Sequence, residues 1–228
     1  MHHTVSIAID GPAASGKSSV GLRIAEDLGF IFLDTGIMYR AVTLAALKKD
    51  LDIENEELIS QLARQIDIEI KRPSKSDGRV NDIFLDGEDV SWQIKDAQVN
   101  DQVSQVSTYA GVRNAMTDQQ RKISEQGNIV MVGRDIGTIV LPNANYKFFL
   151  NASVEERARR RFAEELSRGK EMKLEDILEN LRSRDLLDSS RSIAPLLAAD
   201  DAIIIETDRK NLDQVVEEIR NHIRLRGE

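Results

Sequence analysis

The stretch "GPAASGKS", residues 11–18, limits the possible fold more than any other part of the sequence. It matches the pattern G-x-x-x-x-G-K-[ST], in which small residues let the backbone bend around a phosphate and loop N–H groups point at that phosphate. The apolar run "TVSIAID" before it indicates a buried strand. After it, Val20, Ile24 and Leu28 are spaced by four, which predicts an amphipathic helix. This strand–loop–helix order predicts binding of a nucleoside triphosphate.

The residue types in this loop predict different roles. Lys17 is expected to reach the β- and γ-phosphates, and Ser18 is expected to bind Mg²⁺. A glycine-rich turn without a ligand is the alternative, but a chance match in a chain of this length has a frequency on the order of 1%. The ATP-binding residues predicted from the motif are Gly11, Pro12, Ala13, Ala14, Ser15, Gly16, Lys17, Ser18 and Ser19.

Short apolar runs alternate with helical sequence along most of the chain. After the first strand, further strands are predicted at "FIFLD", "NIVMVG", "YKFFLN" and "AIIIE". Helices are predicted at "TGIMYRAVTLAALKKD" and at "LDQVVEEIRNHIRL". Strands that are apolar on both faces belong to parallel sheets covered on both sides. The pattern therefore predicts an α/β fold of the P-loop type, with three layers (α/β/α) and a five-stranded parallel core sheet.

One region departs from this alternation of strands and helices. Residues 66–101 alternate apolar and polar side chains on both sides of a turn rich in Pro, Ser, Asp and Gly. Such alternation is typical of half-exposed antiparallel strands, so this region is predicted to be a small antiparallel β insert. Residues 1–65 and 102–228 are then the core domain. Within that core, the highly charged helical segment at about 157–190 is predicted to be a moving lid.

Composition excludes several classes of protein. The 228-residue chain has a formal net charge of -8, which argues against nucleic acid as its main partner. It has no cysteine, so disulfides, zinc–thiolate sites and thiol catalysis are excluded. No apolar run approaches the roughly 18 residues that a membrane span needs, and the first ten residues do not resemble a signal peptide. A cytoplasmic protein without a membrane partner is expected.

A GTPase would carry the motif Asn-Lys-x-Asp for guanine, and this sequence does not contain it. The arginines give the next indication of function. Arg40 and Arg134 follow predicted strands on the side where parallel sheets bind ligands. Two further groups share helical faces by their spacing, namely Arg157 with Arg160 and Arg161, and Arg184 with Asp188 and Arg191. A solvated helix face with ion pairs is the alternative for each of these groups. The residues alone predict a Mg-ATP-dependent phosphotransferase with an anionic acceptor.

Several motifs taken together resemble one family. These are "IDGPAASGKSS", "FLDTGIMYRA", "GRDIGTIVLP", "ERARRR", "RDLLDSSR" and "APLLAADDAIIIET". They are similar to the bacterial cytidylate kinases, P-loop nucleoside monophosphate kinases that transfer a phosphate from ATP to CMP or dCMP. The resemblance runs from about residue 4 to the final helix and includes the β insert. It implies a cytoplasmic monomer of pyrimidine nucleotide metabolism, with Mg²⁺ bound alongside ATP.

The resemblance also implies site residues. Arg40 and Arg134 resemble arginines that hold the CMP phosphate, and Asp135 resembles the acceptor for the cytosine amino group. Arg184 and Asp188 resemble a ribose-side pair. The full implied CMP-binding set is Thr35, Arg40, Ser104, Arg113, Arg134, Asp135, Arg184, Asp188 and Arg191. The implied catalytic cations are Lys17, Arg40, Arg134, Arg157, Arg160, Arg161 and Arg191.

The expected chemistry needs no general base, since the acceptor phosphate is largely ionised at neutral pH. Bringing two polyanions together is the difficulty, and Mg²⁺ with the cations would neutralise charge for an in-line transfer. Asp135 would face a carbonyl if UMP replaced CMP, so CMP and dCMP are the predicted acceptors. One departure is Val132, where family members often have Asp; it raises the question whether loop or metal geometry is altered.

Two other functions remain open on the sequence. The first is a different small P-loop kinase, acting on shikimate or on another nucleoside monophosphate, which would show no preference for cytosine. The second is a nucleotide-dependent switch or binding module that binds ATP without transferring phosphate. Release of ADP that depends on a particular acceptor separates these alternatives from a CMP kinase.

Overall fold

The computed structural model describes residues 4–167, 169, 171–191 and 193–227, with side chains described as far as residue 224. The chain divides into two compact units. The first consists of Met1–Leu33 and Ser124–Glu228, and the second of Asp34–Ile123. Each unit contains its own sheet, and each is described separately below.

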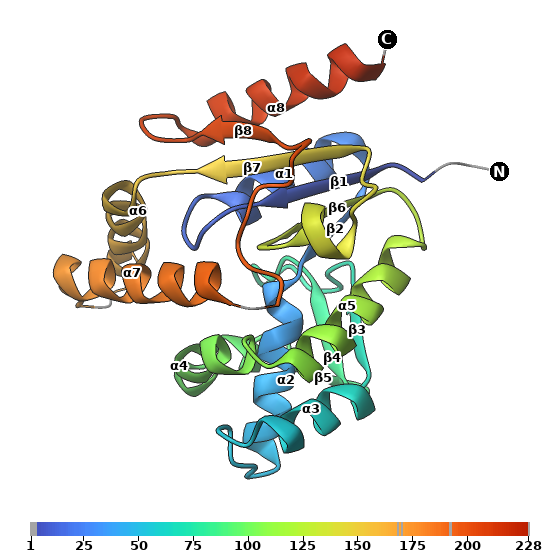
Figure 1. Ribbon diagram of the computed structural model, residues 1–228, viewed down its shortest axis with the longest axis vertical. Helices are drawn as coiled ribbons and strands as arrows, with labels where there is room; N and C mark the ends of the chain where they lie inside the picture. The colour runs from blue at the N-terminus through green and yellow to red at the C-terminus, as the bar shows by residue number, and fades with distance from the viewer. Residues whose placement is uncertain (1–3, 168, 170, 192, 228) are drawn as a thin grey trace. The chain divides into compact units, whose positions relative to one another are not determined.

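The first unit is built on a five-stranded sheet (Figure 1). Its strands are β1 (Ser6–Asp10), β2 (Ile31–Asp34), β6 (Ile129–Gly133), β7 (Tyr146–Asn151) and β8 (Ile203–Glu206), in the order β2-β6-β1-β7-β8. The central strand β1 pairs in parallel with β6 on one side and with β7 on the other. All five strands coincide with apolar runs identified in the sequence, so the predicted parallel core sheet is confirmed.

The α-helices described in the first unit are α1 (Lys17–Leu28), α6 (Val154–Ser167), α7 (Leu174–Ser190) and α8 (Leu212–Gly227), and a short π-helix, η2 (Ile136–Val140), follows β6. Ile24 of α1 and Ile219 of α8 join Ile7, Val130 and Phe148 of the sheet in one core cluster. Helices α1 and α8 therefore anchor to the sheet through their apolar stripes. Helix α1 ends at Leu28 because Gly29 adopts a left-handed conformation there, as its sequence position predicts.

The second unit holds most of the remaining helices and an antiparallel sheet. Its elements are α2 (Gly36–Lys48), α3 (Glu56–Gln65), β3 (Ile68–Lys71), β4 (Asp82–Leu85), β5 (Glu88–Asp89), the 3-10 turn η1 (Gln93–Lys95), α4 (Ala97–Val106) and α5 (Ala110–Ser124). Strand β4 pairs antiparallel with both β3 and β5, which confirms the antiparallel part of the fold prediction. The unit is wider than the predicted insert at 66–101, because α2, α3, α4 and α5 belong to it as well.

Candidate active site

The loop at residues 11–16 connects β1 to α1, and two of its glycines have conformational roles. At Gly11, a side chain would overlap the backbone carbonyl oxygen of Leu150. Gly16 caps the N-terminus of α1 with a φ of 96°, a conformation that favours glycine. The glycine spacing of the motif therefore follows from one close approach and one left-handed residue. Backbone N–H groups of such a loop and of the following helix N-terminus form an anion site.

Lys17 is the first residue of α1, and its side chain lies back across the loop. Its Nζ donates to the carbonyl oxygen of Pro12 at 2.6 Å and lies 3.4 Å from the Ser15 hydroxyl. The residue is buried, so its positive charge is concentrated within the loop. Ser18 follows on the exposed side of the first helical turn. This places a cation and an accessible hydroxyl next to each other, as the motif predicts.

Asp10, the last residue of β1, is a site residue that sequence reasoning missed. Its two carboxylate oxygens accept hydrogen bonds from the backbone N–H of Ile136 at 2.8 Å and of Gly137 at 2.7 Å. Burial raises the pKa of Asp10 to about 6, against the lowering effect of those hydrogen bonds. The carboxylate thus fixes the segment that follows Asp135 to the strand that enters the phosphate loop. An acidic residue at the end of a buried strand was the available signal.

Arg134 comes together with Asp188 and Arg191, from which it is separated by more than fifty residues in the sequence. Arg134 Nε donates to Asp188 Oδ2 at 2.8 Å, and Arg191 Nη2 lies 3.3 Å from Asp188 Oδ1. Burial alone would raise the pKa of Asp188, but Arg134 and Arg191 hold it below its ordinary value. Arg184 also contributes to this lowering. The structure therefore groups three of the predicted arginines around the carboxylate of a fourth predicted residue, Asp188.

The three arginines of α6 that the sequence predicted as site residues have different partners. Arg157 donates to the carbonyl oxygens of Ala13 and Ala152 and pairs with both carboxylate oxygens of Asp185. Arg160 donates to the Thr207 carbonyl oxygen at 2.5 Å. Arg161, whose side chain is 41% exposed, pairs with Glu164 and Glu165 on its own helix. Their common spacing along α6 therefore does not give them a common environment.

Asp135 is a buried residue of the first unit, and the second unit contains the four remaining predicted site residues. Arg40, on α2, donates to Asn100 Oδ1 at 2.5 Å and lies 3.4 Å from the Ile94 carbonyl oxygen. Arg113, on α5, is buried over the ring of Tyr39 and donates to the Ser107 carbonyl oxygen at 3.1 Å. Thr35 is a buried residue at the start of α2, and Ser104 lies on α4. Asn100 was not predicted from the sequence, which gives no sign of its contact with Arg40.

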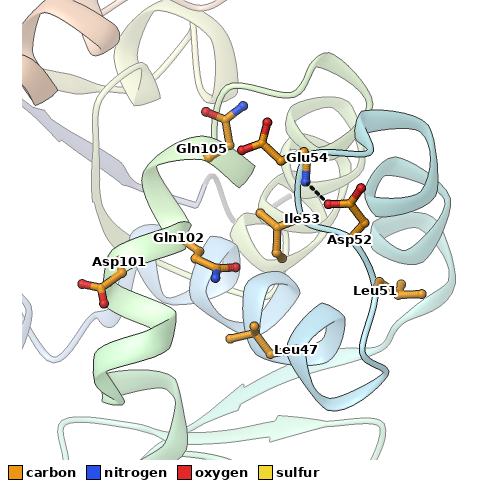
Figure 2. Close-up of a pocket in the computed structure, with 8 residues that line it drawn as sticks. All are labelled: Leu47, Leu51, Asp52, Ile53, Glu54, Asp101, Gln102 and Gln105. Atoms are coloured by element: carbon orange, nitrogen blue, oxygen red, sulfur yellow. Dashed lines mark hydrogen bonds between the residues drawn. The ribbon is translucent and has the colours of Figure 1, made fainter.

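The second unit also has a cavity of about 440 Å³ between the α2–α3 connection and α4 (Figure 2). It is lined by Leu47, Leu51, Asp52, Ile53, Glu54, Asp101, Gln102 and Gln105. None of the predicted site residues is among these. Three carboxylates in its wall make it unsuitable for a phosphate. Across the described residues, no three His, Asp or Glu side chains gather in a way that would hold a metal ion, and none of the described helices is long and apolar enough to span a bilayer.

Comparison with known proteins gives one family. The model of the cytidylate kinase family matches residues 7–225. The chain is 48% identical over 221 residues to a cytidylate kinase of Caldanaerobacter subterraneus, covering 97% of this chain and 95% of the relative. It is 46% identical to a cytidylate kinase of Bacillus licheniformis, covering 96% of each. The resemblance seen in the motifs therefore extends along nearly the whole chain.

Solved structures share the fold at low sequence identity. A shikimate kinase from Bacteroides thetaiotaomicron matches with a TM-score of 0.50 at 14% identity, covering 97% of this chain and 99% of that one. An uncharacterised protein from Eubacterium ventriosum matches with a TM-score of 0.50 at 15% identity, covering 97% and 98%. At such identities the likeness concerns the α/β fold alone.

Proposed function

Because the chain belongs to the cytidylate kinase family, we propose roles for its residues in the reaction of that family. The enzyme phosphorylates CMP or dCMP with ATP, giving CDP or dCDP and ADP. Kinases of this kind use ATP together with a divalent metal ion. The observation that carries the residue assignments is the buried Lys17 within a phosphate loop whose two glycines are sterically required.

Residues 11–19 bind the ATP phosphates in this proposal, with Lys17 reaching the β- and γ-phosphates. The metal is Mg²⁺, held by the Ser18 hydroxyl together with phosphate oxygens and water. Mg²⁺ is commonly bound by few protein ligands plus substrate phosphates, so the exposed Ser18 hydroxyl fits it without a carboxylate cluster nearby. When bound, the ion neutralises phosphate charge.

Arg134 and Arg191 bind the acceptor phosphate, and the existing pairing of both with Asp188 supports this role. Arg184 and Asp188 hold the ribose. Asp135 accepts the cytosine amino hydrogen; in UMP the same buried carboxylate would face a carbonyl oxygen, which repels it. For the residues of the second unit, Arg40, Thr35, Ser104 and Arg113, the support is the sequence resemblance.

Phosphoryl transfer depends on charge neutralisation and on alignment of the two substrates. An ionised phosphate oxygen of the acceptor can attack without a general base. Arg160 and Arg161 on α6 remain candidates for cations that act during transfer, within a segment at 157–190 that excludes water when it closes. We also propose that the enzyme acts as a cytoplasmic monomer without a nucleic-acid partner.

The test is coupled ADP release with Mg-ATP and each of CMP, dCMP, UMP, AMP, GMP and shikimate. We expect strong release with CMP and dCMP alone. Lys17→Ala is expected to lower kcat/KM by about 100- to 1,000-fold, because a charge aimed at the transferred group is lost. Comparable rates with UMP would contradict the role of Asp135. An unchanged rate for the Lys17→Ala variant would contradict the role of the loop.

A further inference from the structure

We propose that Arg157 is a positioning residue that fixes the phosphate loop through Ala13, and that it does not itself contact the transferred phosphoryl group. The inference rests on the proposed function of the loop as the ATP phosphate site. It changes the role that the resemblance implies for Arg157, and it brings in Asp185, to which neither the motifs nor the family resemblance gave a role.

The first argument is that the hydrogen-bonding capacity of Arg157 is nearly used. A guanidinium has five N–H donors. One goes to the Ala152 carbonyl oxygen at 3.0 Å, one to the Ala13 carbonyl oxygen at 3.2 Å, and two to Asp185 at 3.0 and 2.6 Å. The side chain is 5% exposed. One donor and almost no accessible surface remain for a substrate, so a direct contact with phosphate would require Arg157 to break existing bonds.

The second argument concerns the peptide that Arg157 contacts. No cis peptide bond occurs in the described chain, and in a trans peptide the N–H points opposite to the C=O. Because Arg157 holds the Ala13 carbonyl oxygen, the N–H of Ala14 faces away from Arg157. Loop N–H groups are the donors that hold phosphate in this motif. Arg157 therefore sets the direction of one such donor without approaching the phosphate itself.

The third argument is that this part of the loop is strained and supported from outside. Ala14 has a φ of 58°, which is unfavourable for a residue other than glycine. Ala13 packs against Ala158 of α6 and against Ile177 and Leu181 of α7. The base of the α6–α7 hairpin thus holds the loop by apolar contacts and by one hydrogen bond from Arg157. Asp185 on α7 aligns the guanidinium through a bidentate pair.

Asp185 separates the two possible roles of Arg157. If Arg157 acts on phosphate, Asp185 competes for it, and removal of the carboxylate charge leaves transfer unchanged or faster. If Arg157 positions the loop, Asp185 is part of the support, and its removal weakens ATP binding. The test measures dissociation constants for Mg-ATP and for CMP separately, together with kcat, in Arg157→Ala, Asp185→Asn and the double variant.

We expect the ATP dissociation constant to rise roughly 10- to 100-fold in Arg157→Ala, the range for a lost hydrogen bond to a charged group. Asp185→Asn should shift it in the same direction by less. The double variant should bind ATP no more weakly than Arg157→Ala, since both residues act through one contact. The CMP dissociation constant should stay within about twofold of wild type in all three.

Arg159→Ala is the matched control on the same helix. Arg159 is 66% exposed and its recorded partner is Glu156, so all parameters should remain at wild-type values. If Arg157→Ala unfolds, Arg157→Lys replaces it, because lysine keeps the charge and loses the bidentate geometry. In our proposal the lysine variant still binds ATP more weakly than wild type. If only the positive charge of Arg157 mattered, the lysine variant would bind ATP as wild type does.

Two results would overturn the proposal: a lower kcat with unchanged ATP affinity in Arg157→Ala, or faster transfer in Asp185→Asn. Lys17→Ala separates this from failure of the proposed function. If Lys17→Ala weakens ATP binding and Arg157→Ala does not, only the role of Arg157 is wrong. If Lys17→Ala leaves ATP binding unchanged, the assignment of the loop is wrong.

Discussion

Asp10 in the first unit and Asp82 in the second are equally shielded from water, at 4% and 3% exposure, but their pKa values move in opposite directions. Burial raises the pKa of Asp10, whose hydrogen-bond donors are two backbone N–H groups. Hydrogen bonds from Ser74, with help from Arg79, hold the pKa of Asp82 below its ordinary value. The exposed fraction alone therefore does not give the direction of the pKa shift. Desolvation is the largest influence at Asp10, whereas the hydrogen bond from Ser74 is the largest at Asp82.

The partners also separate a structural site from a functional one. Arg79 pairs with Asp77, Asp82 and Asp89, and the group with Ser91 forms what we call the Arg79 cluster. Its carboxylates outnumber its cation, so it offers nothing to an anionic ligand. The carboxylate of Asp10 is not offset by a cation in this way. Of the influences on its pKa, the lowering by Lys17 is the smallest. Uncompensated charge next to the phosphate loop is typical of functional regions.

The largest effect on the fold is expected when the cation of the cluster is removed. Arg79→Met removes the cation that three neighbouring carboxylates share, which should lower the melting temperature by roughly 10 °C. The single tryptophan of the chain, Trp92, donates to Asp77 at 3.0 Å, so its fluorescence reports on the cluster. Arg72→Met, at an exposed arginine of the same region, is the control. Unchanged melting and fluorescence in Arg79→Met would mean that the cluster is not structural.

Asp10→Asn should affect activity more than stability. The amide presents an NH₂ group to one of two backbone donors, so the segment after Asp135 loses one of its two fixing bonds. We expect kcat/KM for CMP to fall roughly tenfold, with little change in the urea midpoint at neutral pH, because burial of the charge no longer has to be offset. Asp82→Asn should affect stability more than activity. If the two variants changed activity and stability to the same relative extent, the two regions would not differ in this way.

The pH dependence of stability should differ in sign between these carboxylates. The folded-state pKa of Asp10 is raised from 3.8 to about 6, so its contribution is fully present below pH 3.8 and is lost as pH rises through 6. That shift corresponds to about 3 kcal/mol. Asp77, Asp82 and Asp89 have lowered pKa values, so they stabilise above pH 3.8 and lose this effect in stronger acid. Urea unfolding of wild type and Asp10→Asn between pH 4.5 and 7 measures the first effect; parallel curves would exclude it.

The smallest effect is expected at Asn100. Arg40 is held by a neutral amide and a carbonyl oxygen, unlike the carboxylates around Arg79. Asn100→Ala should raise KM for CMP a few fold, because the guanidinium of Arg40 loses one hydrogen bond that positions it, and leave KM for ATP unchanged. Asn100→Asp should raise KM for CMP further, because a carboxylate competes with phosphate for Arg40. An Asn100→Asp variant with wild-type KM would show that Arg40 does not bind the acceptor phosphate.

Much of the fold follows from the sequence because its signals are local. Strand periodicity, the phosphate loop and the glycine that ends α1 each depend on neighbouring residues, and the structure agrees with them. The contacts of Arg157 with Ala13 and Asp185 connect residues 144 and 28 positions apart, and no local pattern encodes them. The Arg79 cluster likewise depends on how the chain turns between β3 and β5.

The position of Val132 in the fold explains this departure from the family pattern. In the sequence it raised a question about the loop that follows. In the structure it is a core residue of β6, and a Cβ added at Gly21 of α1 would lie 2.5 Å from its Cγ1. The valine side chain therefore packs under α1, where an aspartate would be buried without the environment it needs.

The order β2-β6-β1-β7-β8 has a consequence for how this chain is made. Strand β1 ends at Asp10 and is synthesised well before its neighbours in the sheet, which begin only at Ile129 and Tyr146. At 5–20 residues per second, a ribosome needs roughly 6–24 s to travel from the end of β1 to the start of β6. During that interval the buried strand at the centre of the sheet has neither of its two parallel neighbours. Chaperone capture of nascent chains is therefore expected to concentrate on β1.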